Sequence, residues 1–259
     1  MRISNKILRF ALILLFWILV WWIGAEVYGK PLLFPTPLAV LKTLAELLGT
    51  ADFYLATLQS LKNIFFGFFA ALLIGCLLAV LTARFKLLRD LLFPIMSVIK
   101  ATPVASFIIL LLIWIGAATV PFVITALIVL PIVWTNLDVG FQSIDPQLVE
   151  VAIVYRFSYG KRMRYLTLPS LYPYLISACR TSMGLAWKAG IAAEIIAMPK
   201  NTIGMMIGDA KQYILTSEMF AWTLTVILLS ILIEFGFSAL LRKLASKYPL
   251  EGGADHAES

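Results

Sequence analysis

Long runs of apolar residues, separated by short polar stretches, dominate this chain. A transmembrane helix needs about 20 mostly apolar residues, so the pattern predicts six membrane-spanning segments. The spans are expected at about residues 8–28, 64–83, 103–114, 120–137, 171–197 and 221–241, the third with an interrupted apolar approach from Leu91. The runs are continuous and do not alternate between apolar and polar positions, which favours helices over barrel strands.

The composition is typical of a membrane protein without a large soluble domain. Hydrophobic residues make up 61% of the chain and charged residues 14%, and the mean hydropathy is +0.95. Soluble domains carry about 25% charged residues. Because the polar stretches are too short for a separate catalytic domain, residues 1–259 are predicted to form one all-α transmembrane domain. The polar tail, residues 249–259, is expected to be disordered.

The distribution of charge predicts an orientation. A net charge of +7 would suggest a nucleic-acid partner in a soluble protein, but here the basic residues cluster between the apolar runs. They gather before the first span and after the second, fourth and sixth. By the positive-inside rule, both termini and the loop at residues 138–169 are predicted to be cytoplasmic. The chain is therefore expected to be a multi-pass protein of the inner (cytoplasmic) cell membrane, without a nucleic-acid partner.

Small residues recur at four-residue spacing in two of the spans. The first stripe is Ala71, Gly75 and Ala79, and the second is Ala178, Ser182, Ala186 and Gly190. Such stripes allow helix backbones to approach closely in lipid. They predict interfaces between helices, either within one bundle or between two subunits.

A short basic, amphipathic segment, residues 150–169, separates the fourth span from the fifth. Asp145 can cap a helix that enters this segment, and Pro146 suits its first position. Gly160 should interrupt the helix, and a second short helix should end at Pro169. The residues alone leave two interpretations open. The segment is either an interfacial loop in contact with anionic lipid or a helix that docks on a soluble partner.

Lys100 stands directly before a predicted break in the third span. Thr102 and Pro103 should interrupt the helix there, and broken helices often line a substrate cavity. All three residues are therefore pathway candidates. For Lys100, snorkelling to the cytoplasmic interface is the preferred interpretation.

The fifth span contains Arg180, Trp187, Lys188 and Glu194. Charged residues inside spans are costly, so they indicate a functional or a pairing role. Contact with substrate and pairing with other spans fit the three charged residues equally well. Trp187 is a further pathway candidate, although core packing is favoured for it. The net positive charge of the span favours an anionic substrate.

The segment that begins at Glu150 resembles the cytoplasmic loop of ABC importer permeases. In that family the loop reads Glu-Ala-Ala, three residues, Gly, eleven residues and Leu-Pro, and the matching residues here are Glu150, Ala152, Leu168 and Pro169. Val151 replaces the middle alanine and Arg156 stands at the glycine position. Gly160, four residues later, is expected to supply the flexibility of the missing glycine.

Further stretches resemble permeases of the nitrate/sulfonate/taurine/bicarbonate group. They are FPTPLAV at residues 34–40, KATPVASFIILLLIWIG at 100–116, GLAWKAGIAAEI at 184–195 and NTIGMMI at 201–207. The resemblance implies a type I ABC importer permease of six helices, with a short coupling helix between the fourth and fifth. It also implies that Glu150, Ala152, Arg156, Gly160, Leu168 and Pro169 couple the chain to an ATPase, with Ala152 at the floor of a groove on that partner.

The resemblance further implies an assembly and a task. The expected partners are a second, identical permease subunit, two cytoplasmic ABC ATPases, an extracytoplasmic substrate-binding protein and the lipid of the membrane. The expected function is to form the pathway by which a small anion or organic solute is imported at the expense of ATP. Two alternatives are the transmembrane scaffold of a vitamin-precursor uptake transporter and an ion-driven carrier.

The chain itself is not expected to be an enzyme. It has no Gly-rich phosphate-binding loop followed by Lys-Ser/Thr, so ATP and Mg²⁺ are expected on the partner ATPase and no cofactor on this chain. The single histidine is His256 in the tail. No metal site is therefore predicted.

Overall fold

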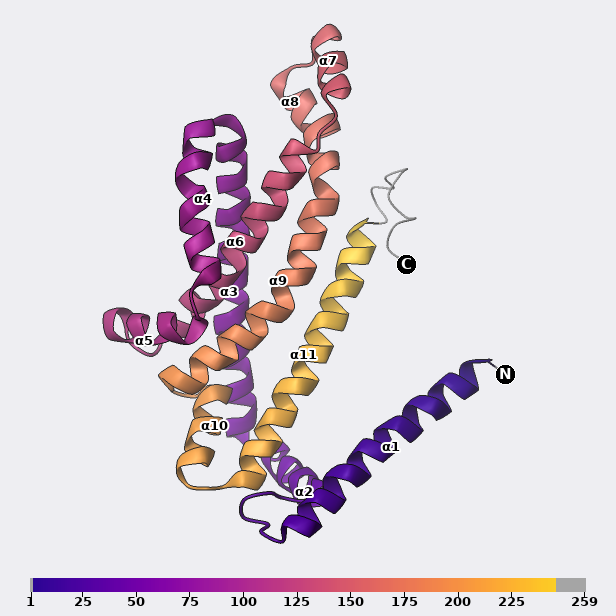
Figure 1. Ribbon diagram of the computed structural model, residues 1–259, viewed down its shortest axis with the longest axis vertical. Coiled ribbons are helices and arrows are strands. Elements are labelled where there is room, and N and C mark those ends of the chain that lie inside the picture. The colour runs from indigo at the N-terminus through magenta and orange to yellow at the C-terminus, as the bar shows by residue number, and fades with distance from the viewer. Residues whose placement is uncertain (1, 246–259) are drawn as a thin grey trace.

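The chain forms only helices in the part that the computed structural model describes, residues 2–245 (Figure 1). The predicted all-α architecture is confirmed, and the tail predicted to be disordered lies outside the described residues. In chain order the elements are α1 (Arg2–Tyr28), α2 (Pro37–Leu48), α3 (Ala51–Arg84), α4 (Lys86–Ala101), α5 (Val104–Ile115), α6 (Val120–Gln142), α7 (Pro146–Val154), α8 (Tyr159–Arg162), the π-helix η1 (Met163–Thr167), α9 (Leu168–Ala197), α10 (Ile203–Gln212) and α11 (Thr216–Ala245).

Four of the described helices are long and apolar enough to cross a membrane, namely α1, α3, α6 and α11. The pair α4 and α5 passes the same test when the two are taken together as one broken span. The fifth predicted span corresponds to α9, whose 30 residues would extend about 45 Å. Its polar and charged residues keep α9 out of the apolar group, so its crossing of the membrane stays a prediction.

The third predicted span has different bounds in the structure. Residues 103–114 fall almost entirely in α5, whose 12 residues extend only about 18 Å and cannot cross a bilayer alone. The preceding helix α4 meets α5 at 103°, an arrangement that fits a broken span or a re-entrant loop. The predicted break is confirmed at Thr102, which has an extended ψ of 131°. The ring of Pro103 disfavours a helical conformation at the residue before it.

The core of the bundle lies where α6 packs against α3 and α9 (Figure 1). All the residues of both predicted stripes of small residues are buried. A Cβ atom added at Gly75 would lie 2.9 Å from Val133 Cγ1, and one added at Gly190 would lie 2.5 Å from Ile64 Cγ1. The stripes are therefore interfaces within the bundle, which decides between the two possibilities that the sequence left open.

The bundle has two chemically different ends. We call the upper end in Figure 1 the basic end, because Arg84 closes α3 there, Lys86 opens α4 and Arg162 lies in α8. The loop that contains α7 and α8 projects from this end. The opposite end holds α2, α10 and the turn from α10 into α11 (Figure 1).

Helix α1 runs outward from the bundle and keeps most of its apolar surface exposed (Figure 1). Its last turns are held at the opposite end, where Trp21 Nε1 donates a hydrogen bond to the Pro35 carbonyl over 3.1 Å. The ring of Trp21 also stacks on Phe220 of α11, with 5.8 Å between the ring centroids. An apolar helix exposed in this way fits a lipid environment.

Candidate functional site

Helix α7 forms the tip of the loop at the basic end, and its start follows the sequence prediction. The Asp145 carboxylate accepts a hydrogen bond from the Gln147 N–H over 2.8 Å. Pro146 occupies the first turn, where a missing N–H costs nothing. A carboxylate at this position also interacts favourably with the positive end of the helix dipole.

The end of α7 is a Schellman motif, in which two backbone N–H groups bond back across the last turn. The Arg156 N–H donates to the Ile153 carbonyl and the Phe157 N–H donates to the Ala152 carbonyl, each over 2.9 Å. This motif requires a left-handed residue, usually glycine, and Arg156 supplies it with φ +50°. Arg156 stands where the resembled permeases have glycine, so the bend is made here by a residue that adopts it at a cost.

Gly160 does not replace the missing glycine, contrary to the expectation from the sequence. It lies within α8, and its φ is not positive. A Cβ atom at Gly160 would meet nothing within 4 Å. The bend belongs to Arg156 alone, because the Schellman hydrogen bonds fix the left-handed residue directly after the last turn of α7.

Replacing Arg156 with glycine is expected to stabilise the end of α7 by about 1 kcal/mol, because a side chain disfavours the left-handed conformation. That free energy corresponds to roughly fivefold slower hydrogen exchange at the amides of the last turn of α7. Hydrogen exchange with mass spectrometry on the purified protein measures the change. Gly160→Ala is the control and should not slow exchange in α7. Faster exchange in Arg156→Gly would contradict this account of the bend.

Pro169 does not end a helix, which corrects a second expectation. Helices α8, η1 and α9 follow one another without a gap from Tyr159 to Ala197. Pro169 lies in the first turn of α9. The π-turn before it has an N–H of Leu168 bonded to the Met163 carbonyl. A π-turn shifts the hydrogen-bond register, which lets the helix accept a proline at this point.

The loop carries a large exposed apolar surface. Val154 and Tyr155, at the end of α7, are 77% and 73% exposed. The other exposed apolar or aromatic side chains of the loop are Leu148, Val151, Ile153, Phe157, Tyr159, Tyr165 and Leu168. Exposed apolar patches of this extent mark an interaction surface.

The predicted coupling residues lie on different sides of this loop. Glu150 is exposed, as expected for a residue that faces a partner. Ala152 is only 4% exposed, because its side chain faces the rest of the chain. Ala152 therefore cannot form the floor of a partner's groove in this conformation, and its neighbours Val151, Val154 and Tyr155 present the outer surface instead.

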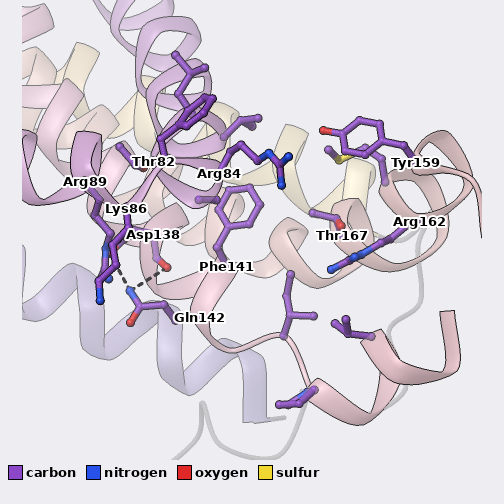
Figure 2. A pocket seen from close by; sticks show the side chains of 18 of the residues that line it. Thr82, Arg84, Lys86, Arg89, Asp138, Phe141, Gln142, Tyr159, Arg162 and Thr167 are labelled. Carbon is purple, nitrogen blue, oxygen red and sulfur yellow. Dashed lines mark hydrogen bonds and ion pairs between the residues drawn. The ribbon is translucent and has the colours of Figure 1, made fainter. Parts of the chain in front are cut away.

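A cavity of about 1100 Å³ opens beside the loop at the basic end. One wall comes from the end of α3 and the start of α4, and the other from α7 and α8, with the end of α6 between them. Figure 2 shows Arg84 and Arg162 extending into this space from the two walls, with Phe141 and Thr167 between.

An ion pair closes one side of the cavity, and the sequence analysis did not find it. Arg89 Nη2 donates a hydrogen bond to Asp138 Oδ2 over 2.9 Å, and Arg89 Nε lies 2.9 Å from Oδ1 (Figure 2). Gln142 Nε2 donates to the same Oδ2 over 2.8 Å. The pair joins α4 to α6. One signal could have revealed it: Asp138 is an acidic residue at the end of an apolar run, at the same membrane face as Arg89.

Lys100 lies at the end of α4, about 21 Å along the helix axis from Lys86 and away from the basic end. Its position relative to a membrane interface stays a prediction. Lys100 Nζ donates a hydrogen bond to Thr135 Oγ1 of α6 over 2.7 Å. Thr135 and Asn136 also line a smaller cavity of about 370 Å³ against α9.

One face of α9 is polar and exposed in the single chain. Ser177, Arg180, Thr181 and Lys188 are all exposed, and they lie within an arc of about 100° on the helix. Ser177 also lines the smaller cavity, next to Thr135. No acidic side chain among the described residues forms an ion pair with Arg180 or Lys188. The Glu234 carboxylate of α11 lies against Gly184, between these two cations on α9. Charged residues on a membrane helix face protein or water rather than lipid.

Trp187 belongs to the core instead of this exposed face. It is 1% exposed, and its Nε1 donates a hydrogen bond to the Val226 carbonyl of α11 over 3.2 Å. Core packing, the interpretation favoured from the sequence, is therefore confirmed. Because Trp187 is buried against α11, its side chain is not available to line a pathway in this structure.

Glu194 is fully buried and has a structural position. Ser60 Oγ of α3 donates to Glu194 Oε2 over 2.6 Å and accepts from the Ile203 N–H over 2.9 Å. The Gly204 N–H donates to the same Oε2 over 3.3 Å. These bonds satisfy free N–H groups of the first turn of α10. Glu194 therefore fastens α10 to α3 and α9 and does not face the exposed polar surface.

Comparison with known proteins agrees with this architecture. Residues 71–248 match the family model described as binding-protein-dependent transport system inner membrane component. The taurine transport system permease protein TauC of Escherichia coli is 28% identical over 233 residues, which cover 87% of this chain and 84% of TauC. The nitrate import permease protein NrtB of Synechocystis sp. is 29% identical over 252 residues, covering 93% and 90%. The riboflavin transport system permease protein RibX of Chloroflexus aurantiacus is 26% identical over 231 residues, covering 88% and 85%.

Proposed function

The chain belongs to the family of binding-protein-dependent transport system inner membrane components, and we propose that it forms the membrane pathway of an importer driven by a separate cytoplasmic ATPase, which docks on α7. The observation that carries this proposal is the exposed apolar surface of the α7–α8 loop. This surface projects from the basic end of the bundle (Figure 1). A soluble protein partner docked there would bury side chains such as Val154 and Tyr155.

The ATPase would hold ATP and Mg²⁺, because this sequence has no phosphate-binding loop of its own. The basic end would lie in the cytoplasm of the cell together with both termini, in accordance with the positive-inside rule. The opposite end, with α2 and α10, would then receive the extracytoplasmic binding protein. This orientation brings the ATPase to the loop and the binding protein to the other side of the membrane.

A second copy of the chain would complete the pathway. The polar face of α9, with Arg180, Thr181 and Lys188, is exposed in one chain and cannot face lipid without a large free-energy cost. Two copies that bring these faces together would enclose a polar route between them. Lys100 and Thr135 lie beside the same route, because the smaller cavity joins α6 to α9.

Arg180 and Lys188 favour a small anion or a negatively charged organic solute as the substrate. Both are cationic, and neither forms an ion pair among residues 2–245, while one carboxylate, that of Glu234, lies against Gly184 between them. The names of two relatives state nitrate, which is an anion, and taurine, which carries an anionic sulfonate group. An ion-driven carrier and the scaffold of a vitamin-precursor uptake transporter are not favoured, because the chain matches a binding-protein-dependent family over residues 71–248.

Neutralising the two cations together, as Arg180→Gln with Lys188→Gln, is expected to lower import on the order of tenfold, because two favourable charge interactions with a passing anion are lost. Import of taurine and of nitrate would be measured in proteoliposomes that contain the whole complex, with and without internal ATP and Mg²⁺. Import by the unchanged complex should require both.

The matched control is Arg180→Lys with Lys188→Arg, which keeps both positive charges and should keep most of the import rate. Both double variants should still bind the ATPase. If the neutralised variant fails to assemble, Arg180 and Lys188 are structural residues. If it assembles and imports at the full rate, they do not line the pathway.

A further inference from the structure

The large cavity at the basic end carries uncompensated positive charge. Its walls include four basic side chains and two acidic ones. Arg89 and Asp138 neutralise each other, as described above. The remaining cations are Arg84, Lys86 and Arg162, and none of them forms an ion pair within the described residues. Glu150 is the one acidic residue of the walls left to oppose them.

The cavity also opens onto a surface that faces lipid. Val80 belongs to its wall and is exposed on α3, which passes as a membrane span. Phe85 is a second exposed apolar residue of the wall, and Leu87 follows it on α4. Arg84 is the last residue of the span and Lys86 opens the next helix. The turn from α3 into α4 therefore brings two cations, Arg84 and Lys86, next to the exposed apolar residues Phe85 and Leu87 at the end of an apolar helix.

We propose that this cavity binds the headgroup of an anionic phospholipid, with its phosphate between Arg84 and Arg162 and its acyl chains along α3 and α4. Basic pockets between membrane helices favour such headgroups, and guanidinium groups bind phosphate through paired hydrogen bonds. A free anion would use only the charged part of the cavity. A phospholipid also covers the exposed apolar residues beside it, and this favours the lipid as the occupant.

The site would join the two walls of the cavity. Arg84 comes from the end of α3, whereas Arg162 comes from α8, directly after the α7 loop. A phosphate held by both would fix the loop to the α3–α4 turn. Phospholipid binding would in this way reduce the mobility of the segment that projects from the membrane.

Native mass spectrometry of the full chain in complex with its ATPase, titrated with phosphatidylglycerol or with phosphatidylcholine of the same acyl chains, tests the proposal. Phosphatidylglycerol is expected to bind more tightly. Arg84→Gln with Arg162→Gln should weaken its binding roughly 30-fold, because each cation near a membrane surface contributes about fivefold. Lys161→Gln with Arg164→Gln removes two charges from the same loop outside the cavity and should change binding less than about twofold.

Four outcomes would overturn the proposal. One is equal binding of the two lipids. Another is an equal loss of phosphatidylglycerol binding in the two double variants. A further one is that inorganic phosphate competes for the cavity as strongly as phosphatidylglycerol does, which would make the cavity a site for soluble anions. The last is lipid binding by the chain alone but not by the complex, which would mean that the ATPase covers the cavity. Arg84→Lys with Arg162→Lys keeps both charges and should retain binding, which guards against a misfolded variant.

Discussion

Tyr155→Asp is expected to detach the ATPase from this protein and to abolish ATP-driven import. Tyr155 is 73% exposed at the end of α7, so the substitution disturbs few contacts within the chain. Buried tyrosines at protein interfaces commonly contribute 2 kcal/mol or more, and the loss of one such residue weakens binding by about 30-fold or more. A carboxylate in the same apolar contact adds a desolvation cost. Co-purification of the ATPase and import in proteoliposomes measure the two effects.

Tyr213→Asp is a closely matched control. Tyr213 is also 73% exposed and also follows the last turn of a short helix, but it lies at the opposite end of the bundle. The same change of side chain and the same unfavourable charge at a helix C-terminus are therefore introduced far from α7. The control should keep the ATPase. If Tyr155→Asp retains the ATPase as well as Tyr213→Asp does, the α7 loop is not the docking surface.

Gly204→Ala is expected to give the largest loss of stability among glycine-to-alanine changes in residues 2–245. A Cβ atom at Gly204 would lie 2.2 Å from Glu194 Cβ and 2.4 Å from the Glu194 carbonyl carbon. Backbone atoms cannot move aside without disturbing α9, so α10 must shift and its bonds to Glu194 and Ser60 must weaken. We expect a loss of about 3 kcal/mol or more, which corresponds to a melting temperature lower by about 6–12 °C.

Thermal unfolding of the purified chain, followed by tryptophan fluorescence, measures this loss. Gly236→Ala is the control, because a Cβ atom at Gly236 in α11 would meet nothing within 4 Å. Alanine also favours a helix over glycine, so the control should melt no lower than the unchanged protein. Equal melting temperatures for the two variants would show that α10 is not packed on Glu194 as described.

The sequence was sufficient for features that depend on composition and local chemistry. Continuous apolar runs predicted the helices α1, α3, α6 and α11, because burial in lipid selects apolar residues directly. The cap at Asp145 and the break before Pro103 were also predicted, since each depends on a few neighbouring residues. The start of α3 at Ala51 was missed, because its first turns are mixed in polarity and are held by packing.

Features that depend on distant partners could not be predicted. Ser60 and Glu194 are 134 residues apart in the chain, and nothing local indicates that they bond. The burial of Ala152 and Trp187 likewise depends on which side of each helix meets the rest of the bundle. The place of Lys100 at the far end of α4 depends on where that helix begins, and the predicted third span from residue 103 did not include α4. The departure at Arg156 was visible in the sequence, but its left-handed conformation required the backbone.

The unbroken helical path from Tyr159 to Ala197 has a mechanical consequence. The loop at the basic end and the cations of α9 lie on one helical path, with the π-turn η1 near its end. Pro173 lies inside α9, and the helix bends along its length (Figure 1). Lys188 lies about 37 Å along this path from Met163. A rotation of 10° about η1 would therefore move Lys188 sideways by up to about 6 Å. A small rotation at the basic end is thus converted into a larger displacement of the α9 cations.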